Sequence, residues 1–259
     1  MKAKIQPHIL CQSGDIAPYV LLPGDPGRVL RMAALLDSYK EIVFNREYRV
    51  VTGLYRGVPV TICSTGMGGP AAAIGIEELI KVGGKVFIRV GSCGANDKKI
   101  KIGDLIISDS VIRQDHTCLD YVPLQFPAIA DPEIFSLLTQ TAQKLKTQLK
   151  FNYYTGPTVS VDALYSPKTK ESKTFWQPFG ALAQDMEAAT VLTLARIRKV
   201  KAGVILLVVD TEGEKNVAAK IAEYSTQAKN NKGFLVEYEK RGVKLALETI
   251  YNYHQKYHG

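Results

Sequence analysis

Apolar and polar residues alternate along this chain in two patterns, short apolar runs and longer amphipathic stretches. The run Gly203–Val209 is apolar throughout, which is typical of a strand covered on both faces by helices. Such runs predict strands at 19–22, 41–44, 48–55, 58–64, 85–90, 104–109 and 203–209, with a further strand near 152–161. Helical periodicity predicts helices at 27–36, 70–82, 132–146, 186–198 and 233–254.

The order of these elements predicts the fold class. Because strands and helices alternate, we expect a three-layer α/β domain with a mixed, twisted sheet flanked by helices. Strands 48–55 and 58–64 are close enough in sequence to form a hairpin around Arg56-Gly57. No linker rich in Pro, Gly or Ser divides the chain, so residues 1–259 are expected to form a single domain.

Composition narrows the class of protein. A hydrophobic content of 46% fits a globular protein with a full core. The net charge of +8 favours anionic ligands, but the lysines are dispersed and no basic run is interleaved with aromatic residues, so we expect no nucleic-acid partner. No apolar run is long enough to span a membrane and Met1–Pro7 has no signal-peptide core, so a cytoplasmic location is expected. Four scattered cysteines without CxxC spacing are expected to be reduced thiols rather than metal ligands.

The segment 85–94 carries the first candidate for ligand chemistry. Arg89 lies inside an apolar run, where a guanidinium is costly unless an anion neutralises it. We expect the strand to end in Gly91-Ser92-Cys93-Gly94, where the Ser92 hydroxyl and the backbone N–H groups would complete an oxyanion cradle. The alternative is a core arginine paired with a carboxylate, and this segment alone does not decide between the two.

A second anion-type segment follows the apolar run 19–22. The turn Pro23-Gly24-Asp25-Pro26-Gly27-Arg28 precedes a predicted helix, with Asp25 as its N-cap and Pro26 as its first residue. A helix N-terminus attracts anions, and Arg28 adds a fork of donors. The alternative is an ordinary loop with a solvated arginine. The glycine-rich stretch Thr65–Pro70 also precedes a helix. Either its backbone approaches the ligand closely, or it is a plain loop that connects a strand to the helix.

Acidic residues mark two further positions. Asp185-Met186-Glu187 opens the helix 186–198, and this combination suits a sugar, with the apolar face on Met186 and vicinal hydroxyls on Glu187. Asp210 directly follows the strand 203–209, at the strand end where ligands of α/β sheets gather, and a partly desolvated carboxyl there can act as a general acid. The alternatives are helix-dipole partners and a turn aspartate.

Six segments in the same order resemble the hexameric-type nucleoside phosphorylase family, and the closest likeness is to purine nucleoside phosphorylases. The segments are Gly24-Asp25-Pro26-Gly27-Arg28, Asn45-Arg46-Glu47-Tyr48, Arg89-Val90-Gly91-Ser92-Cys93-Gly94, Ser160-Val161-Asp162-Ala163-Leu164-Tyr165, Asp185-Met186-Glu187-Ala188-Ala189 and Val209-Asp210. The resemblance implies a phosphorylase/hydrolase-like fold whose sheet forms a distorted barrel. It also implies a homo-oligomer, a hexamer built as a trimer of dimers, with sites shared between subunits.

The same resemblance implies an activity and a set of site residues. The activity is phosphorolysis of purine ribonucleosides to free base and ribose 1-phosphate, with inorganic phosphate as co-substrate and no cofactor or metal. The phosphate-binding residues would be Gly24, Arg28, Arg46, Arg89 and Ser92. The ribose-binding residues would be His8, Met186 and Glu187. Arg46 and His8 would serve a neighbouring subunit's site. Asp210 would protonate N7 of the base, and the base pocket would contain Leu164, Tyr165 and Asp185.

The sequence departs from the family pattern near the base. Bacterial purine enzymes of the family place an arginine about a dozen residues after the catalytic aspartate, whereas no arginine follows Asp210 before Arg241, so Lys215 or Lys220 is the expected substitute. Uridine phosphorylases carry a Gln-x-Arg reader after the Tyr165 region and lack the strand-end aspartate. This chain has no such reader and has Asp210, which favours a purine. The alternatives are a uridine phosphorylase, a nucleosidase and a non-catalytic nucleoside-binding protein of the same fold.

Overall fold

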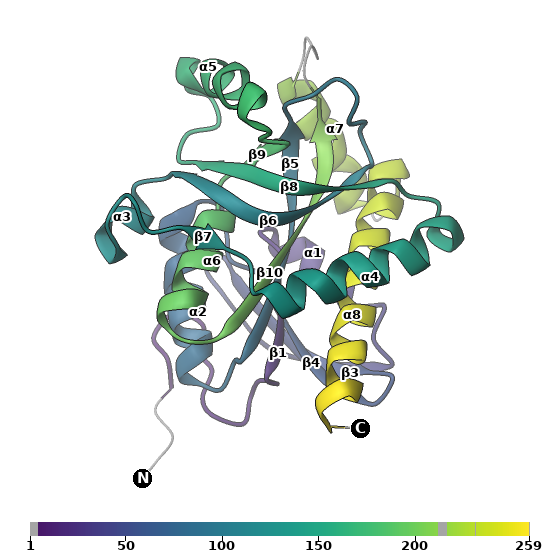
Figure 1. Cartoon of the computed structure of the whole chain (residues 1–259). Helices are drawn as coiled ribbons and strands as arrows, with labels where there is room; N and C mark the ends of the chain where they lie inside the picture. Colours follow the sequence, from purple (N-terminus) through teal and green to yellow (C-terminus); the bar gives the residue numbers. More distant parts are fainter. Residues whose placement is uncertain (1–4, 212–216, 231, 259) are drawn as a thin grey trace.

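The computed structural model describes residues 5–211, 217–230 and 232–258 (Figure 1). Its strands are β1 (Tyr19–Leu22), β2 (Ser38–Asn45), β3 (Tyr48–Tyr55), β4 (Val58–Cys63), β5 (Val86–Ala95), β6 (Leu105–Gln114), β7 (Ala128–Ile129), β8 (Tyr153–Val161), β9 (Ala183–Asp185) and β10 (Lys201–Asp210). Its helices are α1 (Pro26–Ala33), α2 (Gly69–Lys81), α3 (Thr117–Tyr121), α4 (Pro132–Leu149), α5 (Pro167–Trp176), α6 (Ala188–Ile197), α7 (Val217–Lys229) and α8 (Phe234–His258), with a 3₁₀ turn at Gln177–Phe179.

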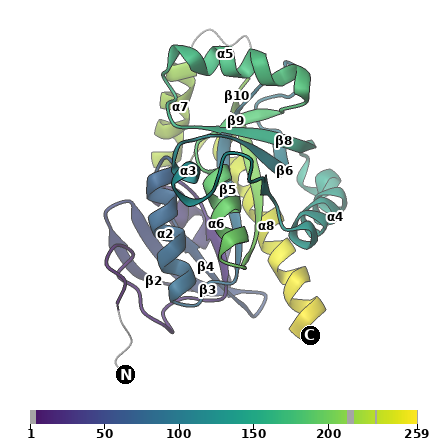
Figure 2. The same cartoon turned by 60° about the vertical axis from the view of Figure 1, so that its left-hand side comes forward.

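All the strands of the described chain belong to one mixed sheet that closes on itself. The order is β10-β6-β8-β9-β5-β1-β4-β3-β2, with β7 paired to β6 off this path. An additional pairing of β10 with β5 closes the first five strands into a barrel. Strand β5 therefore has three neighbours, because β1 and β10 run parallel to it and β9 pairs with its last residues. This closed, mixed sheet flanked by helices confirms the predicted fold class (Figures 1 and 2).

Helices cover the sheet on both faces, as the continuous apolar strands predict. Successive residues of β5 point to opposite faces, so Phe87 joins the hydrophobic cluster under α2 and α6, whereas Ile88 joins the cluster under α1, α4 and α8. Figure 2 shows α2 and α6 on one side of the central strands and α8 on the other. Both faces of β5 are therefore buried around Arg89, which is 3% exposed, so its charge has almost no access to bulk water.

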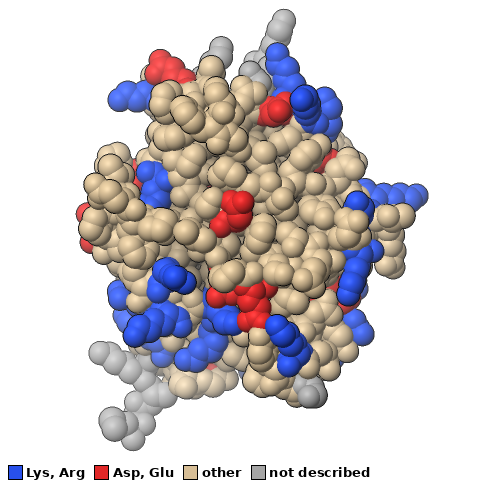
Figure 3. All heavy atoms as spheres, in the orientation of Figure 1, with Lys and Arg blue, Asp and Glu red and all other residues tan. Residues whose placement is uncertain are grey.

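The surface bears out the dispersal of positive charge expected from the sequence. On the face shown in Figure 3, Lys and Arg are scattered over the lower half and the rim, and the centre carries little charge. This face presents no continuous basic surface of the kind that follows a nucleic-acid backbone. Among the described residues, no helix is both long enough and apolar enough to cross a membrane.

Several elements differ from the sequence-based prediction. Strand β5 continues to Ala95 instead of ending at residue 90, because its last residues pair with β9. The helix predicted at 186–198 begins at Ala188, so Asp185 lies in β9 instead of in a helix. Strands β7 and β9 and helices α3, α5 and α7 were not predicted. The two strands are too short to show a period, and the start of α5 is polar on all sides.

A buried ion-pair cluster fastens α1 to the C-terminal helix α8. Glu239 of α8 accepts hydrogen bonds from Nε of Arg28 and Nε of Arg31, both at 2.9 Å, and from the Tyr224 hydroxyl at 2.5 Å. Burial alone would raise the pKa of Glu239, but the cations of Arg28 and Arg31 outweigh it, so the pKa lies below its ordinary value. A carboxyl whose pKa is lowered on folding stabilises the protein above its unfolded pKa, and this contribution disappears as the pH falls through the folded value.

Glu239→Gln should therefore weaken the fold. Removing one charge of a buried network leaves Arg28 without an ion-pair partner and Arg31 with Asp25 alone, and we expect the free energy of unfolding at pH 7 to fall by about 3 kcal/mol. The wild type should lose stability below about pH 4.3, whereas the variant should lose less over the same range. Urea denaturation at pH 7 and pH 4 measures both effects. The control is Glu237→Gln on the same helix, where the carboxylate is 62% exposed and should contribute little. Equal stabilities of the two variants would contradict this account.

Candidate active site

The candidate site lies where the parallel strands β1, β5 and β10 end. The register pairs Leu22 of β1 with Arg89 of β5, and Asp210 of β10 with Gly94 of β5. The turn that begins at Pro23 therefore starts beside Arg89, and Asp210 lies beside the end of the same strand. The sheet thus brings together three segments that the sequence singled out, at the carboxyl ends of its strands.

Arg89 is buried and pairs with two carboxylates. Its Nε donates to Oδ2 of Asp185 at 3.0 Å, and one terminal nitrogen donates to Oε2 of Glu187. The other terminal nitrogen, Nη1, is buried and has no hydrogen-bond partner among the described residues. Arg89 therefore fits both alternatives raised by the sequence. It forms an ion pair in the core, and its Nη1 remains available to donate to an anion.

Glu187 links Arg89 to the glycine-rich loop. Its Oε1 accepts from the backbone N–H of Gly68 at 2.6 Å, so the loop after β4 reaches the carboxylate. Burial raises the pKa of Glu187; Arg89 opposes the shift, and the neighbouring Asp185 adds to it. Met186, beside it, is half-buried and packs against a small apolar cluster that includes Val159. An acceptor next to an apolar surface is thus present, as the sequence predicted for a sugar.

Asp185 is the residue that fixes this arrangement. Its Oδ1 accepts from Ser160 Oγ at 2.5 Å, and its Oδ2 accepts from Arg89 and from the backbone N–H of Ala188 at 2.9 Å. Both carboxylate oxygens are therefore engaged within the protein, and the side chain is fully buried. These contacts position Arg89 and the start of α6, and contact with a base stays a prediction.

Arg28 is close to the same strand but is held by other partners. Its Nη1 donates to the carbonyl of Val90 at 3.1 Å, its Nη2 donates to the Tyr224 hydroxyl at 2.7 Å, and its Nε is paired with Glu239. As predicted, Asp25 caps α1, accepting from the N–H of Arg28 at 2.9 Å. An incoming phosphate would have to share Arg28 with Glu239.

Gly24 and Ser92 both follow Arg89 toward the strand ends, Gly24 after β1, whose Leu22 pairs with Arg89, and Ser92 further along β5 itself. A Cβ at Gly24 would lie 3.2 Å from the carbonyl oxygen of Gly66, so the turn and the glycine-rich loop are in close contact there. Ser92 is half-buried within β5, and its hydroxyl forms no hydrogen bond with another residue in the described part of the chain. It is an available donor, although it lies in the strand and not after it.

His8 and Arg46 lie outside this cluster. His8 is held by Glu78 through its Nδ1 at 2.7 Å, and its carbonyl accepts from Nδ2 of Asn45 at 2.8 Å. Arg46, the next residue, is exposed at the tip of the β2–β3 hairpin with a φ of +53°. Within the described chain neither residue forms a hydrogen bond or ion pair with Arg89. That they reach a neighbouring subunit stays a prediction.

Asp210 is buried and paired with a lysine that sequence reasoning missed. Its Oδ2 accepts from Nζ of Lys173 at 2.9 Å, while its Oδ1 is buried without a partner among the described residues. Of the expected substitutes for the family's arginine, Lys215 and the side chain of Lys220 lie outside the described residues. Lys173 comes from α5, and the signal for this helix was present in Ser166-Pro167: the Ser166 hydroxyl caps it at 3.2 Å and proline occupies its first position.

Leu164 and Tyr165 lie in the connection from β8 to α5. Both are exposed, at 40% and 79% respectively. Their position between β8, which carries Ser160, and α5, which carries Lys173, puts them at the outer rim of the site.

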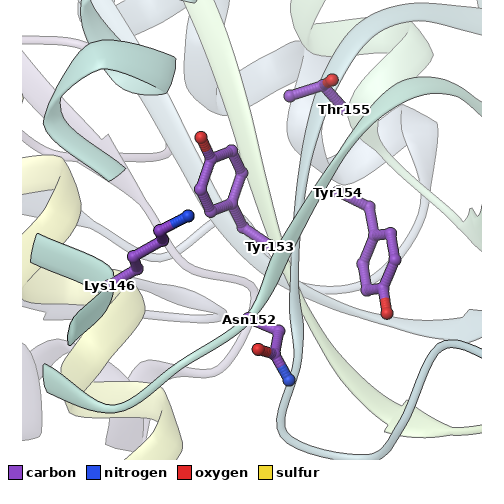
Figure 4. A pocket seen from close by; sticks show the side chains of 5 residues that line it. All are labelled: Lys146, Asn152, Tyr153, Tyr154 and Thr155. Atoms are coloured by element: carbon purple, nitrogen blue, oxygen red, sulfur yellow. The ribbon is translucent and has the colours of Figure 1, made fainter. Parts of the chain in front are cut away.

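A separate hollow lies at the other end of β8 (Figure 4). It has a volume of about 370 Å³ and is lined by Lys146, Asn152, Tyr153, Tyr154 and Thr155. Tyr153 begins β8, whereas Ser160, which contacts Asp185, is near its end. This hollow contains none of the predicted site residues.

Comparison with known proteins assigns the chain and its fold to a family. The sequence model of the phosphorylase superfamily matches residues 18–248. The chain is 44% identical to a uridine phosphorylase of Thermococcus kodakarensis over 216 residues, 79% of this chain and 76% of that protein. It is 37% identical to a guanosine phosphorylase of Halorubrum lacusprofundi over 247 residues, 95% of this chain and 98% of that protein. Its structure is similar to a uridine phosphorylase of Vibrio fischeri, with a TM-score of 0.85, 32% identity and coverage of 95% of this chain and 96% of that one.

This chain therefore belongs to the phosphorylase superfamily. It has the activity of a nucleoside phosphorylase, an enzyme of the pentosyltransferase class. Relatives that act on uridine and on guanosine, as their names state, are both similar to it, so the family alone does not assign its base.

Gly94→Ala should separate Asp210 from Lys173. A Cβ there would lie 2.7 Å from Nζ of Lys173 and 3.0 Å from Oδ2 of Asp210. Because Nζ ends a flexible side chain, the fold should survive while the lysine is displaced, and we expect kcat for nucleoside cleavage to fall on the order of 100-fold. The matched control is Gly242→Ala, where the nearest atom is at 3.5 Å and a methyl group fits. Steady-state kinetics with a thermal melt tests this, and a fully active Gly94→Ala enzyme would show that the pair is dispensable.

Proposed function

We propose that this enzyme converts purine ribonucleosides and inorganic phosphate into free base and ribose 1-phosphate, as a step of purine salvage. The observation that carries the proposal is Asp210: a buried carboxyl at the end of β10, paired with Lys173 on one oxygen and unpartnered on the other. A proton on Oδ1, the oxygen without a partner, can be donated only to a base that lies next to that oxygen.

Phosphate would bind beside Arg89. Its buried Nη1 lacks a partner among the described residues, and Ser92 and the turn at Gly24 lie on the same strand ends. Arg28 would contribute by exchanging part of its contact with Glu239 for the anion, and Arg46 would approach from a neighbouring subunit. Guanidinium groups suit a phosphate because their paired donors match two of its oxygens.

Ribose would lie between the phosphate and the base. Glu187, buried and already joined to Arg89, would accept from the vicinal hydroxyls, while Met186 would pack on the sugar's apolar face. His8 would reach the 5′-hydroxyl from a neighbouring subunit. This order places the reacting carbon between a bound anion and the acid.

The chemistry follows from the charges that develop. As the N-glycosidic bond breaks, positive charge builds on the ribose and negative charge on the base. The bound phosphate stabilises the sugar and then forms the new C–O bond, while Asp210 gives its proton to N7 of the leaving purine. The ammonium group of Lys173 stabilises the carboxylate that remains. The proposal needs no organic cofactor and no metal, because phosphate and Asp210 supply the nucleophile and the acid.

A purine is favoured over uracil on two grounds. Asp210 stands at the end of β10, where the family resemblance implies that uridine phosphorylases have no aspartate, and a guanosine phosphorylase aligns with 95% of this chain. Uridine is the second candidate, because a uridine phosphorylase is 44% identical to it. A nucleosidase is disfavoured by Arg28 and Arg89, since water needs no anion site.

Base release from inosine, guanosine, adenosine, methylthioadenosine and uridine, with and without phosphate, tests the proposal. Purine release should require phosphate, and Asp210→Asn should lower kcat for inosine by about 10² to 10⁴. A nucleoside already methylated at N7 is the control: its base leaves without a proton, so the same variant should cleave it almost as fast as the wild type. Equal rates without phosphate would make the enzyme a nucleosidase, and release from uridine alone would overturn the purine assignment.

We also propose that Arg46 and His8 complete a neighbour's site in a homo-oligomer, a hexamer by the family resemblance. Arg46→Ala and Asp210→Asn should each be nearly inactive alone. Co-expressed, they should regain about a quarter of wild-type activity, because half the dimers are mixed and each mixed dimer holds one intact site. Tandem-tag purification and kinetics measure this. If activity does not exceed the sum of the two parents, each subunit builds its own site.

A further inference from the structure

Three neighbouring strands carry Gln184, Gly94 and Asp210 in one row. Gly94 of β5 pairs with Gln184 of β9 on one side and with Asp210 of β10 on the other. Residues that oppose each other in a ladder project to the same face of a sheet. The position of Asp210 agrees with this rule, because its Oδ2 would lie 3.0 Å from a Cβ at Gly94. An amide and a carboxyl therefore flank the glycine.

Both groups are buried, and each keeps one oxygen without a partner. Gln184 is 5% exposed and Asp210 is 4% exposed. Within the described residues, neither Oε1 of Gln184 nor Oδ1 of Asp210 accepts a hydrogen bond. Buried acceptors are nearly always satisfied in folded proteins, so two of them in one row point to donors supplied by a ligand.

Helix α5 holds both groups with consecutive side chains. Ser172 accepts from Nε2 of Gln184 at 2.8 Å and donates its single proton to Oε1 of Gln114. Because the Ser172 proton is donated to Gln114, the serine oxygen can only accept from Gln184. The amide of Gln184 must therefore turn its Nε2 toward Ser172, and its Oε1 is left to accept from another donor. The next residue, Lys173, fixes Asp210 in the same way.

We propose that Gln184 reads the base, oriented by Ser172, and this rests on the function proposed above. Its Oε1 accepts an N–H from the six-membered ring of the base, and the second proton on its Nε2 donates to the adjacent carbonyl. That pairing fits a lactam edge, where N–H and C=O are neighbours, as in 6-oxopurines. Gln184 is thus a specificity-determining residue, Asp210 is the acid, and Ser172 is a positioning residue.

Gln184→Leu tests this by comparing inosine with purine riboside, which lacks both the N–H and the C=O of that edge. We expect kcat/KM for inosine to fall on the order of 100-fold while the value for purine riboside stays within about threefold. Ser172→Ala should shift the same ratio in the same direction by about tenfold. Glu171→Gln, on an exposed neighbour in α5, is the matched control and should leave the ratio unchanged.

Other outcomes separate the two proposals. Equal losses with both nucleosides in Gln184→Leu would make Gln184 structural, and an unchanged ratio would exclude it from base reading. If the wild type cleaves uridine only, the purine assignment fails, but uridine and 3-methyluridine then test Gln184 in the same way, since methylation removes the N3–H. If no nucleoside is cleaved, calorimetry with free hypoxanthine and unsubstituted purine decides: Gln184→Leu must weaken only the first.

Discussion

The charge of Arg89 is the constraint on which the site depends. It lies on β5, the strand that pairs with three others and is covered by helices on both faces, so water cannot solvate it. Two carboxylates neutralise the charge, and other parts of the chain hold each of them in place. Ser160 and the start of α6 position Asp185, and the glycine-rich loop positions Glu187. The barrel, a helix start and a loop are therefore held together by one guanidinium. Its remaining nitrogen, Nη1, is buried without a partner among the described residues, and it is there that we propose an anion binds beside the core ion pair.

Much of this could be predicted from the sequence where the determinants are local. The longer strands followed from apolar runs, and the cap of α1 followed from Asp25-Pro26, because neighbours in sequence decide both. The partners of Arg89 could not be derived in this way, since Asp185 and Glu187 are 96 and 98 residues away. The same holds for Lys173, which pairs with Asp210 where Lys215 or Lys220 was expected: it lies 37 residues before the aspartate, on a polar helix without an apolar stripe. The end of β5 was mispredicted because β9, three residues long, extends it.

These contacts divide the site into two parts, one around Arg89 and one around Asp210. Arg89, Asp185 and Glu187 are joined to one another where the barrel meets the start of α6. We propose that Arg89 and Glu187 serve phosphate and sugar, the parts that every nucleoside phosphorylase reaction involves. The side of the site next to Asp210 is built differently, because its polar partners come from α5 at the edge of the fold. Relatives named for uridine and for guanosine both match this chain over most of its length. Differences in base must therefore arise from a few side chains on a common frame, and Gln184 with its serine is such a set.

The bare backbone of Gly94 has a consequence for how such an enzyme can change. Because Gly94 has no side chain, β5 leaves a space there, and Lys173 of α5 fills it. The lysine that pairs with Asp210 thus belongs to the peripheral helix α5 and not to the sheet. Exchanging that one helix would replace Ser172 and Lys173, the partners of Gln184 and Asp210, while the residues proposed for the anion and the pentose stay in place, so base preference can be tuned without risking the integrity of the barrel.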